Sequence, residues 1–367
     1  PSDLEQFAPA TGDKPDFFVR KSIDSVLSLK AETHNFPTTV EPFNGAATGT
    51  GGEIRDRMAG GRASVPLAGT AVYMTSYPRT AADRPWEQYS AARPWLYQTP
   101  RQILTKASNG ASDFGNKFGQ PLICGSVLTF EHEGKADEPT YGFDKVIMLA
   151  GGVGYARRSD AQKGTPEPGE EVVLLGGDNY RIGMGGGAVS SVNTGQYAGA
   201  IELNAVQRSN PEMQKRVENV IRTLSESEDN PIISIHDHGA GGHLNCLSEL
   251  VETTGGHFDL SAFPIGDETL SSKEIIGNES QERMGLLVKG DAVERIARIA
   301  ERERAPMYVV GRTTDDMHLT FEEAGGDKPI DLALSDMFGS APKTYMVDKH
   351  IDKTYPALSY DAAHLEH

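Results

Sequence analysis

Three side chains that could do chemistry together, Lys30, Glu32 and His34, occupy alternate positions in the segment 27–34. Such alternation is typical of a strand, in which successive side chains point to opposite faces, so the three share one face. As an exposed pair, Lys30 and Glu32 would contribute less than about 1 kcal/mol, whereas burying all three side chains without partners would cost several kcal/mol. We therefore expect this face to line a cleft, where Lys30 binds phosphate, Glu32 binds magnesium and His34 accepts a proton.

A run of small residues from Gly45 to Gly52 follows this strand. Glycine lets backbone N–H groups approach an anion closely, so we interpret the run as a phosphate-binding loop. It lacks the Lys-Ser/Thr pair of the Walker A motif and therefore does not indicate a P-loop NTPase. Arg55 and Asp56 come next and could form a local ion pair on a helix. We favour a ligand role, with Arg55 gripping a substrate phosphate and Asp56 binding magnesium, so the region predicts a phosphoryl-transfer site.

A further candidate ligand, Asp237, ends an apolar strand in the second half of the chain. The ends of such strands are common places for ligand-binding residues. His236 and His238 flank it and could instead ligate zinc, with Asp237 as a bystander. No third histidine or cysteine stands nearby in sequence, so we favour Asp237 as a magnesium ligand. Two glycine-rich segments, 183–187 and 239–242, are weaker candidates for binding anions.

The length and composition limit the class of protein. A chain of 367 residues normally forms two domains, and a formal charge of −17 argues against nucleic acid or an anionic membrane as a partner. No segment approaches the roughly 20 apolar residues needed to span a bilayer, and the N-terminal segment has no features of a signal peptide. Cys124 and Cys246 lie far apart without CxxC spacing, which is typical of reduced thiols in a cytoplasmic protein.

Apolar periodicity and helix-boundary residues predict an α+β fold, because strands and helices alternate without long βαβ regularity. Asn210 as N-cap and Pro211 at the first helical position give the clearest helix start. We expect strands over 25–34, 65–74, 118–130, 144–150, 171–177, 231–235, 283–288 and 307–313, and helices over 99–116, 210–227, 241–251 and 291–305. The expected organisation is an extended arm (1–24), a first domain (25–156) with an aromatic loop insertion over 80–98, a linker (157–169), a second domain (170–341) and a connector with a tag remnant (342–367).

Three motifs resemble those of phosphoribosylformylglycinamidine synthase of the large, glutamine-using type. Glu32-Thr-His-Asn-Phe-Pro37 matches E-[ST]-H-N-x-P, the segment from Gly45 to Asp56 matches G-A-A-T-G-x-G-G-x-x-R-D, and Glu279 to Arg283 matches E-S-Q-E-R. The resemblance covers about residues 20–340 and corresponds to the first half of the family's synthetase domain. It implies two domains of the aminoimidazole-ribonucleotide-synthetase-like (PurM-like) fold with the cleft between them.

The resemblance also implies an activity: ATP- and Mg²⁺-dependent amidation of formylglycinamide ribonucleotide, a step of purine biosynthesis, through an iminophosphate that glutamine-derived ammonia attacks. It assigns His34 as proton acceptor and Glu32, Asp56 and Asp237 to the metal. The ATP-binding residues that we predict are Lys30, Gly45, Ala46, Ala47, Thr48, Gly49, Thr50, Gly51 and Gly52. The predicted substrate-binding residues are Thr33, Asn35, Phe36, Arg55, Gln207, Glu279, Ser280 and Gln281. At Phe36 many relatives have histidine, and an aromatic ring can stack but can neither donate nor titrate.

Two alternatives remain open. The chain could be a half that binds nucleotide and substrate without turning them over. It could also be a sister enzyme of the fold, such as aminoimidazole ribonucleotide synthetase or a selenophosphate or thiamine-phosphate kinase relative. The expected partners are the remaining half of the synthetase, a glutaminase and, because domains of this fold pair, a second copy of the chain.

Overall fold

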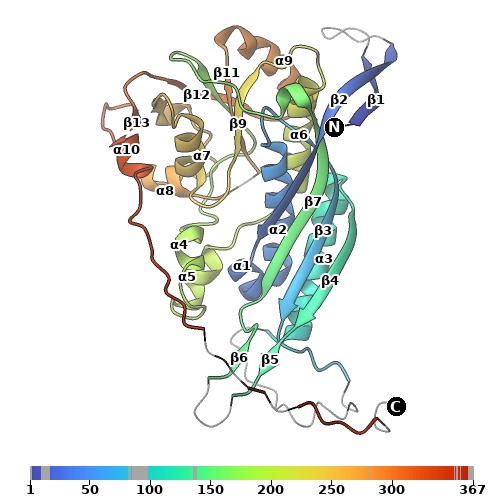
Figure 1. Ribbon diagram of the computed structural model, residues 1–367. Helices are drawn as coiled ribbons and strands as arrows, with labels where there is room; N and C mark the ends of the chain where they lie inside the picture. The colour runs from blue at the N-terminus through green and yellow to red at the C-terminus, as the bar shows by residue number, and fades with distance from the viewer. Residues whose placement is uncertain are drawn as a thin grey trace.

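The computed structural model describes residues 2–9, 17–81, 84, 98–134, 139–280, 282–350, 352, 354, 355 and 357–362. Within them the chain forms two large sheets and a small hairpin, β5 (Glu131–His132) with β6 (Tyr141–Gly142) (Figure 1). Most of the predicted aromatic insertion over 80–98, with both tryptophans, lies outside the described residues. Among the described helices, none combines the length and apolar character that crossing a bilayer requires.

The first sheet has five strands in the order β1-β2-β7-β3-β4. Its strands are β1 (Ser2–Pro9), β2 (Phe18–Thr33), β3 (Val65–Thr75), β4 (Leu122–Thr129) and β7 (Ile147–Arg157). The first part of β2 pairs with β1, from Pro9 opposite Phe18 to Ser2 opposite Ser25, and the rest pairs with β7. Within the predicted extended arm over residues 1–24, β1 therefore pairs antiparallel with the first part of β2.

Helices α1 (Phe36–Val40), α2 (Pro42–Met58) and α3 (Pro100–Phe118) follow in this half. Helix α3 begins at a capping box, in which the side chains of Thr99 and Gln102 bond each other's backbone N–H. It packs closely on α2 because a Cβ at Gly110 would lie 2.0 Å from the carbonyl oxygen of Phe43. Glycine at that position thus sets the distance between the two helices.

The second sheet has seven strands in the order β14-β13-β10-β12-β8-β11-β9. Its strands are β8 (Glu171–Leu175), β9 (Ile232–Asp237), β10 (Gly256–Asp259), β11 (Met284–Val288), β12 (Met307–Thr313), β13 (His318–Glu322) and β14 (Ile330–Ala333). The accompanying helices are α4 (Gly186–Ser190), α5 (Gly199–Asn204), α6 (Pro211–Ser225), α7 (Gly242–Leu250), α8 (Ser272–Gly277), α9 (Val293–Glu303) and α10 (Leu334–Met337). Three-residue 3₁₀ turns lie at Arg158–Asp160, Leu260–Ala262 and Gly290–Ala292.

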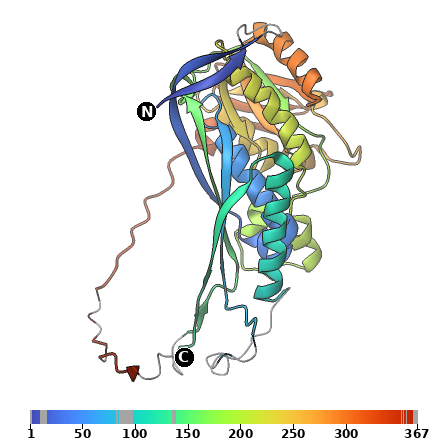
Figure 2. The same ribbon diagram turned by 90° about the vertical axis from the view of Figure 1, so that its right-hand side faces the viewer.

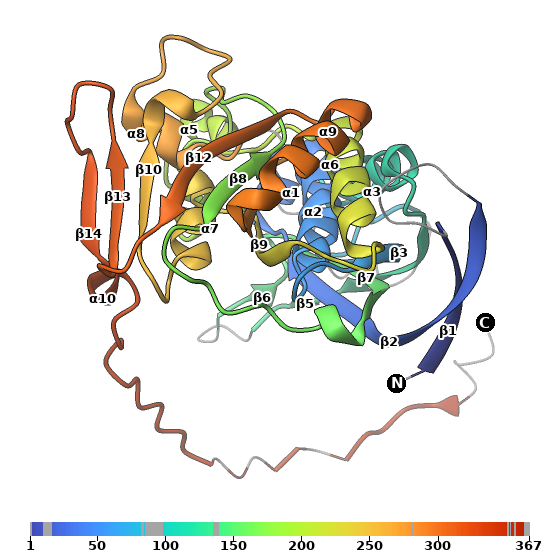
Figure 3. The same ribbon diagram turned by 90° about the horizontal axis from the view of Figure 1, so that it is seen from above.

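Helices α2 and α3 lie between the two sheets, as the view from above shows for α2 (Figure 3). Their small residues, such as Ala46 and Ala107, pack on the five-stranded sheet at Met148. On the other side, larger residues join the second sheet and α6 in one core, which includes Ile54 and Phe114. A separate core with α7 and α8 covers the opposite face of the seven-stranded sheet. One continuous apolar layer therefore connects the halves of the chain.

The predicted elements are confirmed with shifted bounds, and the α+β class is confirmed as well. Asn210 does cap α6, where its side chain accepts a hydrogen bond from the N–H of Met213 at 3.1 Å. The sequence analysis does not predict β1 or the shorter elements α1, α4, α5, α8, α10, β5, β6, β10, β13 and β14. Strand β7 ends at Arg157 and β8 begins at Glu171, on either side of the predicted linker. The domain bounds themselves stay a prediction.

Candidate active site

A cavity of about 760 Å³ lies where β2 and α2 meet β9 and α4. Most of the predicted site residues line it: Lys30, Glu32, Thr33, His34, Asn35, Phe36, Thr48, Gly49, Gly52, Arg55, Asp56, Gln207, Asp237 and Glu279. Other predicted residues are absent from its lining: Gly45, Ala46, Ala47, Thr50, Gly51 and Ser280. Gln281 lies outside the described residues. Two distant parts of the sequence thus meet at one cavity, as predicted.

The alternating face of β2 carries an ion-paired lysine. The ammonium of Lys30 lies 3.2 Å from a carboxylate oxygen of Glu32 and 3.1 Å from one of Asp56 on α2. Burial alone would lower the pKa of Lys30, but the two carboxylates outweigh burial and raise it. Lys30 therefore stays charged and links the strand to the helix at the cavity wall.

Asp56 also faces an acid from the second sheet. Asp237 is the last residue of β9, and its carboxyl group forms a hydrogen bond with that of Asp56. Burial first, and then the charge and hydrogen bond of Asp237, raise the pKa of Asp56 to about 6. Two carboxylates in contact repel each other when both are ionised, so a divalent cation would relieve them.

The donor set fits Mg²⁺, which is commonly held by one or two carboxylates together with waters and phosphate oxygens. Among the described residues, no group of three or more His, Cys, Asp or Glu side chains could enclose a metal. Asp56 and Asp237 are therefore the candidate ligands. Glu32 reaches this pair only through Lys30, so it is the less direct of the three predicted ligands.

His34 follows β2 directly, and its backbone N–H donates to the carbonyl of Met148 on β7 at 3.0 Å. Burial and the nearby Arg55 guanidinium lower the pKa of His34 to about 4. Its ring atom Nδ1 is buried and forms no hydrogen bond with any described residue. The imidazole is thus neutral at physiological pH and able to accept a proton.

The prediction of a glycine-rich loop over Gly45–Gly52 is wrong, because the run lies inside α2. The backbone N–H groups bond along the helix, as Gly45 does to the carbonyl of Glu41 at 2.7 Å, and cannot cradle a phosphate. Packing explains the small residues instead. A Cβ at Gly49 would lie 2.8 Å from the Cβ of His34, and one at Gly51 would lie 2.6 Å from the Phe114 ring. Ala46, Ala47 and Thr50 are buried on the helix faces.

Arg55 does not pair with the neighbouring Asp56 but extends to the other half of the molecule. Its guanidinium donates to Oε1 of Gln214 on α6 at 2.9 Å and lies 3.8 Å from a carboxylate oxygen of Glu282. Gln214 in turn donates to the carbonyl of Gly51 at 3.0 Å. Both contacts use Nη1, whereas Nε is buried and has no hydrogen-bond partner among the described residues. The side chain is only 4% exposed and lines the cavity.

Glu279 and Gln207 also line the cavity and are joined by a hydrogen bond. The carboxylate of Glu279 accepts from Nε2 of Gln207 at 2.8 Å and from the N–H of Gly241 at 3.0 Å, and burial raises its pKa. Ser280 is fully buried; its hydroxyl accepts from the N–H of Tyr180 at 3.1 Å and donates to Asn278. Ser280 therefore supports the loop and does not face the cavity.

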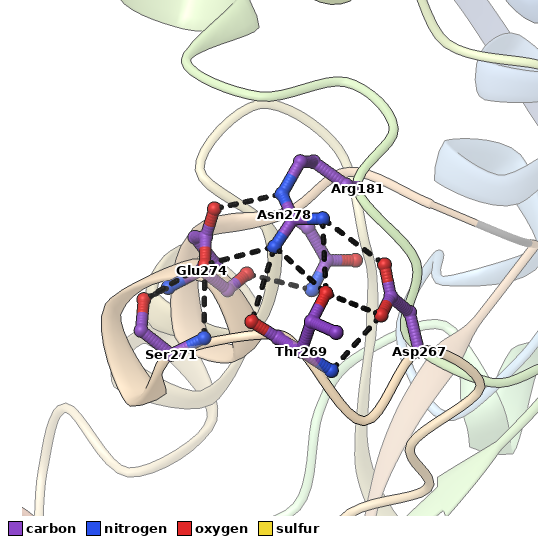
Figure 4. Close-up of polar contacts among 6 residues, drawn as sticks. All are labelled: Arg181, Asp267, Thr269, Ser271, Glu274 and Asn278. Atoms are coloured by element: carbon purple, nitrogen blue, oxygen red, sulfur yellow. Dashed lines mark hydrogen bonds and ion pairs between the residues drawn. The ribbon is translucent and has the colours of Figure 1, made fainter.

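A polar cluster fixes the chain behind this wall (Figure 4). Arg181 donates to Glu274 at 2.9 Å, to Asp267 at 3.1 Å and to the carbonyl of Thr269 at 3.1 Å. Glu274 also completes the capping box of α8 with Ser271. The segment that leads to Gly183–Gly187 is thereby tied to the segment that leads to Glu279, and both reach the cavity.

The two histidines beside Asp237 have different partners. His236 lines the cavity and pairs with Glu249. His238 is buried, and its Nε2 lies 2.9 Å from Nδ1 of His243, which contacts Asn179 at 3.0 Å. The geometry therefore gives the zinc alternative no support.

Sequence reasoning missed two lysines of the cavity, Lys145 and Lys163. Lys145 precedes β7 and Lys163 lies in the segment that connects β7 to β8, so neither belongs to a motif. No local signal marks them, because they reach the cavity only through the tertiary fold.

Comparisons with known proteins agree with this architecture. Residues 167–323 match the family model of the AIR synthase related protein, C-terminal domain. The chain is 38% identical over 366 residues to a phosphoribosylformylglycinamidine synthase of Drosophila melanogaster, covering 98% of this chain and 27% of the relative. It is 42% identical over 334 residues to a probable chloroplastic/mitochondrial phosphoribosylformylglycinamidine synthase of Arabidopsis thaliana, covering 87% and 24%. The chain thus spans about a quarter of the length of these curated relatives.

Solved structures show the same fold. Thermotoga maritima PurL complexed with FGAR superposes with a TM-score of 0.72 at 24% identity, covering 91% of this chain and 49% of that chain. The hydrogenase maturation protein HypE in complex with ATP superposes with a TM-score of 0.52 at 13% identity, covering 83% and 84%. These two likenesses confirm the PurM-like fold. Over nearly its whole length, the chain is similar to one segment of phosphoribosylformylglycinamidine synthase and shares its fold.

Proposed function

We propose that this cavity catalyses the ATP-dependent amidation of formylglycinamide ribonucleotide to formylglycinamidine ribonucleotide. The observation that carries the proposal is the meeting of Lys30, His34 and Asp56 with Asp237, which comes from the other sheet. A cation, a neutral imidazole and a pair of carboxylates are the groups that a phosphoryl transfer followed by ammonia addition requires. The similarity to phosphoribosylformylglycinamidine synthases points to the same reaction.

ATP phosphates would bind at the end of the cavity that holds Lys30, Asp56 and Asp237. The two aspartates would hold Mg²⁺, which supplies positive charge for the phosphate oxygens. Lys30 adds a fixed charge there, since its pKa is raised. The glycine-rich part of α2 has its backbone N–H groups bonded within the helix. Side chains, and not the predicted loop, would therefore bind the phosphates.

In the first step the γ-phosphoryl group of ATP passes to the amide oxygen of the substrate. Ammonia then attacks the carbon that bears this oxygen, and phosphate leaves as the amidine forms. The adduct must lose a proton, and the imidazole of His34 accepts it, because a pKa of about 4 keeps the ring neutral. Released products are ADP, phosphate and the amidine.

The substrate would lie along Thr33, Asn35, Gln207 and Glu279. The side-chain Oδ1 of Asn35 accepts a hydrogen bond from the N–H of Met148 at 3.2 Å. Its amide N–H₂ group would then be available to a ligand. Phe36 is 1% exposed and packs in an apolar cluster with Val189, Ala205 and Val206. Its role is therefore packing, as expected for an aromatic residue at that position.

Ammonia would come from a glutaminase, and the other half of the synthetase would complete the enzyme. The outer face of the five-stranded sheet exposes apolar side chains, among them Leu27, Leu29 and Ile123, which supports pairing with a related domain or a second copy. Sedimentation that showed only monomers would remove the homodimer. A cytoplasmic location and the absence of nucleic-acid and membrane partners also stay predictions.

A second candidate function is ligand binding without turnover, because the chain spans only about a quarter of its relatives' length. Ammonia-driven ATP hydrolysis with formylglycinamide ribonucleotide separates the two candidates. Formation of ADP and the amidine in equal amounts, lost in His34→Ala, supports catalysis by the chain itself. Binding of both ligands without ADP formation supports the second candidate. No binding of the ribonucleotide would reject both.

A further inference from the structure

The basic side chains of the cavity differ in their partners. Lys30 pairs with Glu32 and Asp56, and Arg55 faces Glu282. Lys145 and Lys163 also line the cavity, and no carboxylate of the described residues lies within ion-pair distance of either. Of the two, Lys145 is the one placed beside the segment that carries His34. A cation without a counter-charge in a concave site is a candidate for binding an anionic ligand.

Backbone hydrogen bonds of the residues that follow Lys145 fix its position. Lys145 lies two residues before β7, and its neighbour Val146 donates its N–H to Oγ1 of Thr39 at 3.0 Å. The N–H of Met148 donates to Oδ1 of Asn35 at 3.2 Å. Both acceptors belong to the segment that follows β2, so the base of the Lys145 side chain is fixed against the residues that carry His34.

The side chain of Lys145 reaches α4. Its Nζ donates to the carbonyl of Ser190, the last residue of α4, at 3.0 Å and lies 5.8 Å from the centroid of the Phe36 ring. An ammonium has three donors, so two remain after the bond to Ser190. The buried Phe36 ring stabilises the cation without neutralising it.

The position of Lys145 along the strands sets which ligand group it meets. Lys30 pairs with Gly152 on β7, whereas His34 bonds Met148 and Lys145 comes three residues earlier. Lys30 and His34 are four strand positions apart, about 13 Å. His34 therefore lies between the metal-binding corner, where ATP phosphates would bind, and Lys145, which leaves Lys145 to meet the ribonucleotide.

We propose that Lys145 binds the phosphate monoester of the nucleotide substrate, with Phe36 as its platform and the Ser190 carbonyl as its resting partner. This inference rests on the proposed function for the identity of the substrate. Lys145 gives the phosphate a cation that no carboxylate of the described residues faces, whereas the guanidinium of Arg55, the residue expected from the sequence, lies 3.8 Å from the Glu282 carboxylate and bonds Gln214 through Nη1. Arg55 then serves mainly to join α2 to α6.

The test compares phosphorylated ligands with their dephosphorylated counterparts by calorimetry on the complete chain. Ribose 5-phosphate against ribose, and formylglycinamide ribonucleotide against its nucleoside, are titrated into wild type, Lys145→Met and Lys145→Arg. We expect Lys145→Met to reduce the affinity for each phosphorylated ligand by roughly 10- to 100-fold and to leave the nucleoside unchanged. Lys145→Arg should retain part of the preference, because a guanidinium also binds phosphate.

Two controls guard against a folding effect. Lys106→Met changes an exposed lysine on α3 and should bind every ligand as wild type does. Lys163→Met removes the other cavity lysine without an ion pair among the described residues, which lies near β9 through the bond of Gly164 to Ile233 at 2.7 Å. Loss of the preference for phosphorylated ligands in Lys163→Met but not in Lys145→Met would overturn the role of Lys145. ATP binding that is unchanged in Lys145→Met would show that this variant is folded.

The outcomes separate this inference from the proposed function. An unchanged preference for phosphorylated ligands in Lys145→Met overturns the role of Lys145, while the function stands. An equal loss for nucleotide and nucleoside also overturns it, because Lys145 would then only fasten α4. Wild type that binds ribose 5-phosphate through Lys145 but not the ribonucleotide rejects the proposed substrate and keeps the phosphate site.

Discussion

The carboxyl group of Asp56 on α2 forms a hydrogen bond with that of Asp237, the last residue of β9. The two residues are far apart in the sequence and belong to different halves of the fold. Their contact is what makes the cavity a candidate site for a metal–phosphate ligand.

The first prediction concerns Asp56. Because its pKa is raised to about 6 from 3.8, the unfolded chain loses this proton at lower pH than the folded chain. Stability is therefore fully present below about pH 4 and decreases as the pH rises to about 6. Asp56→Asn should stabilise the metal-free chain by about 1–3 kcal/mol at pH 8 and by little at pH 4.

Urea unfolding at both pH values checks this, with Asp336→Asn on α10 as an exposed control that should show no pH-dependent gain. The same Asp56→Asn variant should lose the increase in melting temperature that Mg²⁺ with ATP gives to wild type. A variant that is less stable than wild type at pH 8 would contradict the strained carboxyl pair.

A second prediction follows from the low pKa of His34. Since the ring stays neutral down to about pH 4, the rate of amidation should not fall with protonation of this residue between pH 8 and about pH 5. Replacement by alanine should reduce turnover by roughly 10²- to 10⁴-fold at any pH in that range. A histidine NMR titration, assigned by His34→Gln, measures the pKa directly.

His34 makes stability depend on pH in the direction opposite to Asp56. Because the folded pKa of His34 lies below the unfolded value of 6.5, the unfolded chain takes up the proton first, and stability decreases as the pH falls from about 6.5 to 4. A His34 resonance that titrates near pH 6.5 would reject the buried neutral imidazole.

The third prediction uses two glycines of α2. A Cβ at Gly49 would lie 2.8 Å from the Cβ of His34, whereas at Gly52 the nearest atom is a guanidinium nitrogen of Arg55 at 3.8 Å. Gly49→Ala should displace His34 and cost about 1–3 kcal/mol despite the better helix propensity of alanine. Gly52→Ala should stabilise the helix by up to about 1 kcal/mol. The melting temperatures of the two variants test this packing explanation. Equal changes in Gly49→Ala and Gly52→Ala would refute it.

A fourth prediction concerns the buried ion pair of Arg57 and Glu53, whose side chains are 3.0 Å apart and 0% and 1% exposed. Arg57→Ala should cost about 3–5 kcal/mol, because it leaves the Glu53 carboxyl buried without its partner. Burial raises the pKa of Glu53 to about 7, so Glu53→Gln should be milder. Denaturant unfolding of both single variants and of Arg57→Met with Glu53→Leu measures this; the double change should recover much of the loss.

How far the sequence predicts this molecule depends on the range of the interactions. Asn210 and Pro211 act on their own helix, so that helix start was predictable. The glycines of α2 were misread because their cause, the ring of Phe114 and the Cβ of His34, lies on other elements. A motif could place Asp237 beside Asp56, but no motif contains Lys145, whose partners Ser190 and Phe36 come from distant segments.

The apolar layer that α2 and α3 share with the second sheet has a practical consequence. The matched family model begins at residue 167, yet cutting the chain there would expose Val217 and Leu286, which Ile54 and Phe114 now cover. A C-terminal fragment expressed alone should aggregate or require detergent. Because helices of the first half pack against both sheets, we expect the two halves to fold as one unit (Figure 2).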